Sequence, residues 1–235
     1  MSLKNKKYLF FDLDSTLTPS RQSIKPEMAD FLPTLGRTII VVSGSKNSQL
    51  RKQIGELSAY LLGQNGNQAI DPTGSMLWEN VLSPEEKMVV QTHIDTLLPQ
   101  LDYHIPDRTD LIEDRGSQIS FSIYGHNAPP EDKKKCDGDF KRRKSLISAF
   151  PFVCDTMEVQ IGGSTCFDYF KKGLNKGTNT KRLIEMMGWD ADKCVYFGDA
   201  LFPGGNDETV VGVIDTVEVT SEDDTLKKLE ENFLT

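Results

Sequence analysis

Two aspartates stand two positions apart near the start of the sequence, within an apolar run at residues 7–14. They are Asp12 and Asp14. A carboxylate such as Asp12 is able to attack phosphorus and form an aspartyl phosphate, which divides one difficult transfer into two easier ones. Asp14 would then lie close enough to protonate the leaving oxygen and later to deprotonate the acceptor. The pair predicts phosphoryl transfer, with Asp12 as the nucleophile and Asp14 as the acid and base.

Two further apolar runs, at residues 38–42 and 194–197, also end in polar residues. The polar residues and glycines that follow them include Ser43, Gly44, Asp199 and Asp207. In an open parallel sheet, ligands bind at the carboxyl ends of the strands, so we expect these residues to meet in one crevice. Carboxylates, waters and a substrate phosphate are the ligands that Mg²⁺ prefers. We therefore predict a magnesium site formed by Asp12, Asp14, Asp199 and Asp207.

A transferring phosphoryl group also needs donors and a positive charge. Ser43 and Thr16 supply neutral donors, and the glycine backbone at Gly44 lines the same crevice. Lys176, at the predicted start of a helix, is the candidate that offsets the charge of the phosphoryl group and of the nucleophile. Arg21 stands just past the catalytic turn, close enough to reach the substrate.

These residues have to be positioned by secondary structure, which hydrophobic periodicity predicts. We expect strands at residues 7–14, 38–42 and 194–197, short strands within 111–123, and a strand pair within 152–170. We expect helices at residues 25–35, 85–98, 132–150, 178–187 and 221–233. The alternation of strand, helix and strand at both ends of the chain is typical of a parallel sheet.

The fold class that follows is α/β, with a Rossmann-like parallel sheet built from both ends of the chain. We expect this core to comprise residues 1–78 and 173–235, interrupted by an α+β insert at residues 79–172. A chain of 235 residues is long enough for a core and an inserted module.

Composition excludes several classes of function. A net charge of −8 argues against nucleic acid as a partner. No apolar run of about 18 residues indicates a membrane span, and the polar start lacks a secretory signal, so we expect a cytoplasmic protein. The four cysteines are far apart and are expected to be reduced thiols. The basic residues within 133–144 are expected to form mostly a solvated helix face.

The ordered motifs resemble those of the haloacid dehalogenase superfamily. Its first motif, Asp-x-Asp-x-Thr, is matched from Asp12 to Thr16, and its later serine and lysine are matched by Ser43 and Lys176. The last acidic motif of the superfamily corresponds to Asp199 and Asp207. The resemblance implies a core with an inserted cap domain, and a carboxylate at Asp14 resembles the phosphotransferase branch.

Three longer segments are similar to the eukaryotic-type phosphomannomutase family. They read TLTPSRQ at residues 16–22, GGSTCFD at 162–168 and FGDALFPGGND at 197–207. In that family, arginines of the cap hold the distal phosphate of a hexose bisphosphate. Arg115 matches the first of these arginines, whereas His126 and Lys133 stand in the places of the other two. Cys166 replaces a serine that contacts the sugar, and Asp168 matches a carboxylate that binds sugar hydroxyls.

The resemblance also implies partners. They are a phosphosugar substrate, a hexose bisphosphate activator and a second copy of the chain, paired through the cap. Three functions stay open at this point: a mutase, a sugar-phosphate phosphatase in which water takes the phosphoryl group, and a binding protein that keeps the fold without turnover. We expect the mutase, which would interconvert mannose 6-phosphate and mannose 1-phosphate. The altered cap positions motivate the phosphatase as the alternative, because a lysine lacks the bidentate fork of arginine and a neutral histidine carries no charge.

Overall fold

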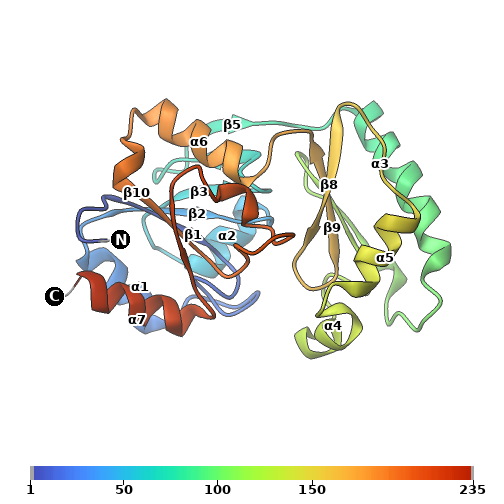
Figure 1. Ribbon diagram of the computed structural model, residues 1–235, viewed down its shortest axis with the longest axis horizontal. Helices are drawn as coiled ribbons and strands as arrows, with labels where there is room; N and C mark the ends of the chain where they lie inside the picture. Colours follow the sequence, from blue (N-terminus) through green and yellow to red (C-terminus); the bar gives the residue numbers. More distant parts are fainter. Residues whose placement is uncertain (1–2, 234–235) are drawn as a thin grey trace. The chain divides into compact units, whose positions relative to one another are not determined.

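The computed structural model describes residues 3–233, and its contacts divide the chain into two units (Figure 1). The first unit comprises the residues up to 79 and those from 174 onward, and the inserted unit comprises residues 80–173. The elements of the first unit are β1 (Tyr8–Asp12), α1 (Pro26–Thr34), β2 (Thr38–Val42), α2 (Asn47–Ile54), β3 (Tyr60–Gly63), β4 (Gln68–Ile70), β5 (Met76–Glu79), α6 (Lys176–Met187), β10 (Cys194–Gly198), β11 (Asp215–Glu218) and α7 (Glu222–Phe233). Those of the inserted unit are α3 (Pro84–Leu97), β6 (Ile112–Asp114), β7 (Ile119–Ser122), α4 (Pro130–Asp137), α5 (Lys141–Ala149), β8 (Met157–Gly162) and β9 (Cys166–Lys171).

A seven-stranded sheet forms the centre of the first unit, in the order β11-β10-β1-β2-β3-β4-β5. The five strands from β11 to β3 are parallel, and β4 and β5 extend the sheet as an antiparallel hairpin. In β1, Phe11 is in register with Phe197 of β10, and Asp12 is in register with Val42 of β2. The predicted α/β fold with a parallel sheet is confirmed. The carboxyl ends of β1, β2 and β10 therefore share one edge of the sheet.

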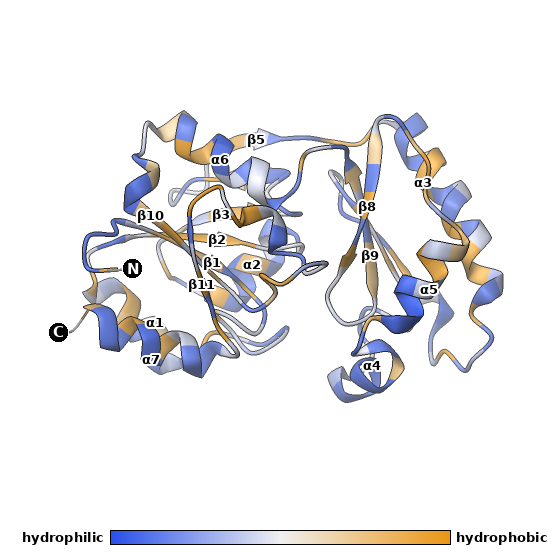
Figure 2. Cartoon of the chain, in the orientation of Figure 1, coloured by the Kyte–Doolittle hydropathy of each residue, from blue (hydrophilic) through white to orange (hydrophobic). Residues whose placement is uncertain are grey.

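Helices cover both faces of this sheet. On one face, alternate residues of the strands pack against α1, α2 and α7, and on the other face the remaining residues pack against α6. Figure 2 shows the central strands as apolar and the covering helices as polar on their outer sides. Burial on both faces explains why β1, β2 and β10 have continuous apolar sequences.

The inserted unit has its own sheet and core. Its four strands are antiparallel in the order β6-β7-β9-β8. Phe121, Phe167 and Tyr169 pack with apolar residues of α3 and α5 in one cluster. Side chains alternate between the two faces of a strand, so the intervening residues Ser120, Cys166 and Asp168 lie on the opposite face. This second face is polar.

One predicted helix, at residues 132–150, is wrong, because the structure has two helices there. The chain turns between α4 and α5 at Phe140, whose φ of 62° is left-handed. Oδ1 of Asp137 accepts a hydrogen bond from the backbone amide of Arg142, at 2.7 Å, and so satisfies a donor in the first turn of α5. The solvated basic face is likewise only partly present, since Lys133 and Arg143 are buried.

The other predicted strands and helices are confirmed, with ends that differ by a few residues. The sequence patterns did not predict α2, β3, β4, β5 or β11. Among the residues that the structure describes, no helix has the length and apolar character needed to cross a membrane.

Candidate active site

Asp12 and Lys176 meet at the carboxyl edge of the large sheet. Asp12 is the last residue of β1, and Lys176 is the first residue of α6. The start of α6 is fixed by a capping box. The side chain of Asn175 accepts a hydrogen bond from the backbone amide of Thr178, and the Thr178 hydroxyl accepts one from the backbone amide of Asn175. The lysine is fully buried, and the aspartate is 4% exposed. Two ends of the chain thus supply one buried ion pair.

The Lys176 ammonium bridges two carboxylates. Its Nζ donates to Oδ1 of Asp12 at 2.5 Å and to Oδ1 of Asp207 at 2.7 Å. Burial alone would lower the pKa of Lys176, but the two carboxylates raise it above its ordinary value. The lysine therefore stays charged. It holds the nucleophile predicted from the sequence at a fixed position beside a second acidic residue.

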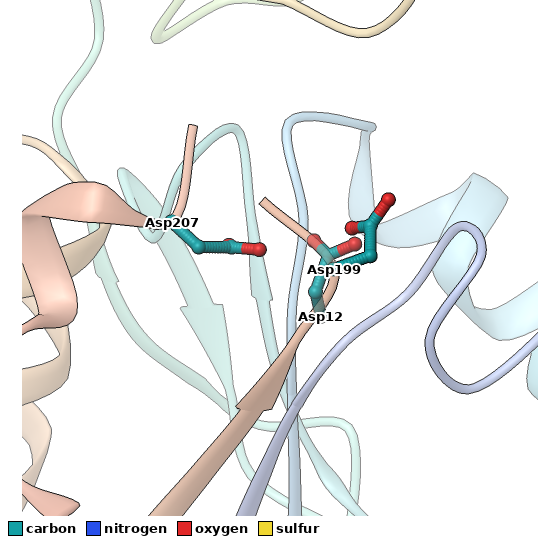
Figure 3. Close-up of side chains that lie close together, drawn as sticks. All are labelled: Asp12, Asp199 and Asp207. Carbon is teal, nitrogen blue, oxygen red and sulfur yellow. The ribbon is translucent and has the colours of Figure 1, made fainter. Parts of the chain in front are cut away.

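Asp199 completes a cluster of three carboxylates with Asp12 and Asp207. Oxygen atoms of the three residues lie within 4.8 Å of one another, and Figure 3 shows the Asp207 carboxylate pointing toward the other two. Burial, and then the charge of Asp207, raises the pKa of Asp199 to about 6. Burial also raises the pKa of Asp12 well above its ordinary value, although Lys176 opposes the shift. The raised pKa values of Asp12 and Asp199 reflect acidic groups that are buried close together at this edge of the sheet.

The donor set fits a hard divalent cation. The three carboxylates carry one more negative charge than Mg²⁺ would neutralise, and Lys176 supplies the balancing positive charge. Carboxylate oxygens with room for water and phosphate are the usual surroundings of Mg²⁺. Asp14, also predicted as a ligand, lies outside this group of three within the described residues 3–233.

The Asp14 carboxylate is oriented by the loop that follows it and by α2. Its Oδ1 accepts hydrogen bonds from the backbone amide of Arg21 at 2.6 Å and from Nε2 of Gln53 at 3.2 Å. Arg21 has a φ of 57°, and this left-handed turn aims its amide at the carboxylate. Gln53 is 2% exposed and also donates to Oγ1 of Thr18. The role of Gln53 is not predictable from the sequence patterns, because it depends on a contact between distant segments.

Ser43 and Thr16, the two predicted hydroxyl donors, are both buried in the first unit. Oγ of Ser43, directly after β2, accepts a hydrogen bond from the amide of Ser45 at 3.1 Å. The intervening Gly44 belongs to the same turn, at the carboxyl end of β2. Within residues 3–233, no hydrogen-bond partner is found for Oγ1 of Thr16, although the atom is buried. Their contacts with a substrate stay predictions.

Tyr196 and Gly177 support Asp207 and Lys176, and the sequence analysis missed both roles. The Tyr196 hydroxyl donates to Oδ1 of Asp207 at 2.6 Å. A Cβ atom added at Gly177 would lie 1.8 Å from the backbone oxygen of Thr209, so only glycine allows α6 to approach this closely. These contacts fix the Lys176 end of the site.

The remaining predicted residues, Arg115, His126, Lys133, Cys166 and Asp168, all belong to the inserted unit. The Arg115 side chain is 7% exposed, and its Nε and a terminal nitrogen donate to Oε2 of Glu113 at 2.9 and 2.7 Å. Another terminal nitrogen lies 3.9 Å from Oδ1 of Asp168. Oδ1 of Asp168 in turn accepts a hydrogen bond from the Ser120 hydroxyl at 2.6 Å. Arg115 is thus oriented in advance by acidic residues on the polar face of the sheet.

His126 and Cys166 form a second contact on this polar face. The two atoms concerned, Nδ1 of His126 and Sγ of Cys166, lie 3.8 Å apart. Nε2 of His126 lies 3.2 Å from the backbone oxygen of Ser120 and donates to it. Lys133 is 8% exposed, and its Nζ donates to the backbone oxygen of His126. The lysine therefore contacts protein backbone at this place.

Arg143 was missed as a site-supporting residue, because it lies within a run of basic residues. Its guanidinium is fully buried, pairs with Asp137 at 2.5 Å and donates to the backbone oxygens of Gly162 and Cys166. A Cβ atom added at Gly162 would lie 2.2 Å from Oδ2 of Asp168. Arg143 and Gly162 therefore fix the strand turn that carries Cys166 and Asp168.

Comparison with known proteins finds similarity over nearly the whole chain. The model of the family described as eukaryotic phosphomannomutase matches residues 28–235. A phosphomannomutase of Spinacia oleracea is 31% identical, covering 100% of this chain and 99% of its own length. One of Schizosaccharomyces pombe is 30% identical, covering 97% and 95%.

Solved structures show the same fold at lower sequence identity. SMU.1108c of Streptococcus mutans superposes with a TM-score of 0.68 and 17% identity, covering 98% of this chain and 100% of that one. A haloacid dehalogenase-like hydrolase of B. subtilis gives a TM-score of 0.63 and 15% identity, covering 93% and 92%. At this identity the likeness concerns the fold.

Proposed function

The chain belongs to the eukaryotic phosphomannomutase family of the haloacid dehalogenase superfamily, and we propose that it interconverts mannose 6-phosphate and mannose 1-phosphate with Mg²⁺. It is an enzyme of the phosphotransferase or phosphatase type found in that superfamily. Its chemistry is phosphoryl transfer on a sugar phosphate. The observation that carries the proposal is the buried Lys176 ammonium, which holds Asp12 beside Asp199 and Asp207.

In the first half of the proposed reaction, a carboxylate oxygen of Asp12 attacks a phosphorus atom of a bound hexose bisphosphate. The bond between phosphorus and the sugar oxygen breaks, and Asp14 gives its proton to the leaving oxygen. The hydrogen bonds from Arg21 and Gln53 orient the Asp14 carboxylate for this transfer. In the second half, Asp14 takes a proton from the acceptor hydroxyl, which attacks the aspartyl phosphate.

Positive charge has to accompany this transfer, because negative charge spreads over the phosphoryl oxygens in the transition state. Lys176 supplies part of it from a fixed position. Asp12, Asp199 and Asp207 would hold Mg²⁺, with Asp14 as the fourth predicted ligand, and the ion would neutralise charge on the phosphoryl oxygens. Ser43, Thr16 and the backbone at Gly44 are proposed as neutral donors to the same oxygens.

The polar face of the inserted unit is proposed to bind the sugar and its second phosphate. Arg115 provides a guanidinium oriented by Glu113, and guanidinium groups bind phosphate with two parallel hydrogen bonds. Asp168 is proposed to accept hydrogen bonds from sugar hydroxyls. A hexose bisphosphate activator would load Asp12 before the first turnover, and pairing of two chains through the inserted unit stays a prediction from the family.

A second candidate function, sugar-phosphate hydrolysis, is favoured by Lys133. Two of the three positions that carry arginine in the family are occupied here by His126 and Lys133. Both side chains are buried, and the Lys133 ammonium donates to a backbone oxygen. A weaker grip on a second phosphate would let water, instead of a sugar hydroxyl, attack the aspartyl phosphate.

One experiment separates these two functions. Purified protein is incubated with Mg²⁺ and mannose 1-phosphate or glucose 1-phosphate, with and without glucose 1,6-bisphosphate. The 6-phosphate product and released inorganic phosphate are measured in parallel. A mutase gives an isomer that depends on the bisphosphate and releases little phosphate. Steady phosphate release without isomer would establish the hydrolase instead.

An Asp12→Asn variant tests the nucleophile in the same assays. The substitution removes the nucleophilic carboxylate and changes the volume of the side chain very little. We expect it to abolish both isomer formation and phosphate release. Turnover that survives in this variant would contradict an aspartyl phosphate at Asp12, whichever of the two products forms.

A further inference from the structure

The Cys166 thiol is a nucleophilic group that the proposed phosphoryl transfer does not use. Cys166 is partly exposed and opens β9 on the polar face of the inserted unit. Its register neighbours are two small residues, Ser122 of β7 and Gly162 of β8. Its backbone oxygen accepts a hydrogen bond from Arg143 at 2.9 Å. The backbone of Cys166 is therefore held by a buried arginine, and part of the residue is open to solvent.

His126 is placed to act as the base for this thiol. The His126 side chain is fully buried, and its Nε2 donates to the backbone oxygen of Ser120 at 3.2 Å. This bond assigns the proton of neutral imidazole to Nε2, so the lone pair of Nδ1 remains for the thiol. Sγ of Cys166 lies 3.8 Å from that Nδ1. The geometry is that of a nucleophile beside an oriented base.

The charges around the two residues support transfer of the thiol proton. Oε2 of Glu113 lies 3.7 Å from Nδ1 of His126 and stabilises the imidazolium. Lys133 donates a hydrogen bond to the His126 backbone oxygen. Burial raises the pKa of the Cys166 thiol, but the hydrogen bond and charge of His126 outweigh it, and the resulting pKa is below the ordinary value. The negative charge of Asp168 raises the pKa of the Cys166 thiol, and the positive charge of Arg115 lowers it.

We propose that Cys166 and His126 form a peroxide-sensitive thiol site in the inserted unit. The Cys166 proton moves to Nδ1 of His126, and the thiolate sulfur attacks one oxygen of a hydroperoxide. The sulfur–oxygen bond forms as the oxygen–oxygen bond breaks, and the leaving oxygen takes the imidazolium proton, so hydrogen peroxide gives water. Sulfur is oxidised by two electrons to a sulfenic acid, and the peroxide is reduced by two. A thiol reductant of the solution reverses the change.

The other cysteines of the chain provide internal comparisons. Cys154 is also partly exposed, but its sulfur contacts a hydroxyl group, Oγ1 of Thr156 at 3.6 Å, instead of an imidazole. Cys194 is buried, and burial raises the pKa of its thiol to about 12. The hydrogen bond with the Thr156 hydroxyl lowers the pKa of the Cys154 thiol, so Cys154 reports an exposed thiol that is activated without an imidazole. Cys194 reports the reactivity of a buried thiol.

The test follows oxidation of each cysteine in the full chain at neutral pH. The protein is treated with hydrogen peroxide, sulfenic acids are trapped with dimedone, and labelled peptides are quantified by mass spectrometry over time. We expect Cys166 to react about tenfold faster than Cys154, because thiolate is the reactive form. A His126→Gln variant should lose this advantage while Cys154 keeps its rate. His104→Gln, at an exposed histidine, should change neither rate.

A second measurement covers the case in which His126→Gln does not fold. Alkylation of each cysteine in the unmodified protein by iodoacetamide is followed against pH. The Cys166 rate should rise to its plateau with a midpoint below the ordinary thiol pKa of about 8.5. A Cys166 rate no faster than that of Cys154 at every pH, or a midpoint at or above 8.5, would overturn the proposal. Both experiments measure covalent modification of cysteines and require no enzymatic turnover, so the inference does not rest on the proposed function.

Discussion

At the scale of single residues, the site is built around charges that balance one another under burial. Lys176 compensates Asp12 and Asp207 at once, and Arg115 is compensated in the same way by Glu113 and Asp168. Unpaired charges in such positions would be strongly unfavourable. Because Asp12, Asp207 and Arg115 each have an oppositely charged partner before any ligand arrives, these side chains are oriented in advance.

A variant of Gln53 tests whether the orientation of the Asp14 carboxylate contributes to the rate of the reaction. A Gln53→Leu substitution removes the hydrogen bond to Oδ1 of Asp14 without adding charge. Because a misplaced catalytic group costs up to about a hundredfold in rate, we expect kcat to fall within that range while KM changes little. Steady-state kinetics measure this. The neighbouring exposed Lys52→Ala serves as the control, and an equal loss in that variant would contradict a specific role for Gln53.

His126 gives a prediction about pH. Burial alone would lower the pKa of His126, but the hydrogen bond and charge of Cys166 and the charge of Glu113 raise it above the ordinary value. Protonation is thus favoured in the folded state. The protonated His126 side chain makes its full contribution to the free energy of unfolding below about pH 6.5. This contribution is lost as the pH rises through the raised pKa of His126.

Titration by NMR measures the His126 pKa directly. The midpoint for His126 should lie above the ordinary histidine value of about 6.5, and a Cys166→Ser variant should lower it. A midpoint for His126 at or below about 6.5 would show that Cys166 and Glu113 do not stabilise the imidazolium.

At the scale of elements, the break between α4 and α5 places a buried ion pair under the turn from β8 to β9. The Arg143 guanidinium reaches from α5 to the backbone oxygens of Gly162, Gly163 and Cys166. Asp137 at the end of α4 neutralises it and accepts hydrogen bonds from the first turn of α5. A single arginine therefore connects two helices with the strand turn.

Removal of one partner from this pair should be costly. In Asp137→Ala the arginine charge stays buried without compensation, so we expect about 3–5 kcal/mol less stability for the inserted unit. Urea denaturation followed by circular dichroism measures the change. Lys141→Ala, at the first residue of α5, removes an ion pair with Asp139 of the preceding turn, but both side chains are largely exposed, and no measurable change is expected. Similar effects of the two substitutions would contradict the structural role of the buried pair.

The elements show which parts of the structure were predictable. The strands β1, β2 and β10 could be predicted because burial on both faces gives continuous apolar runs that end at polar residues. The break at Phe140 could not, since a polar sequence continues through it. Arg143 and Gln53 look like ordinary surface residues in the sequence, because their roles arise from contacts with distant segments.

At the scale of the whole molecule, the acidic site is assembled from segments that are far apart in the sequence. Asp12 comes from the first strand, whereas Lys176, Asp199 and Asp207 come from the last third of the chain. The first unit therefore closes around its site only when both ends of the chain are folded together. Any ion that bridges these segments should stabilise the unit as a whole.

Binding of Mg²⁺ tests whether an ion at the acidic site stabilises the first unit. At a concentration about a hundredfold above its Kd, Mg²⁺ should stabilise the first unit by about 2.7 kcal/mol and raise its melting temperature by roughly 5 °C or more. Differential scanning fluorimetry measures the shift, and chelation with EDTA should abolish turnover until Mg²⁺ is restored. Asp199→Asn should lose the shift, whereas the exposed Asp102→Asn should keep it. An undiminished shift in Asp199→Asn would exclude Asp199 as a ligand.

The position of β1 in the large sheet has a consequence during protein synthesis. β1 pairs with β2 on one side and with β10 on the other, and Leu9, Phe10 and Phe11 are fully buried in the finished fold. While the ribosome is still translating the middle of the chain, the side of β1 that will meet β10 has no strand beside it. Such an apolar edge invites pairing with other nascent chains. The completed chain gains its acidic site and covers this edge in the same step, when β10 pairs with β1.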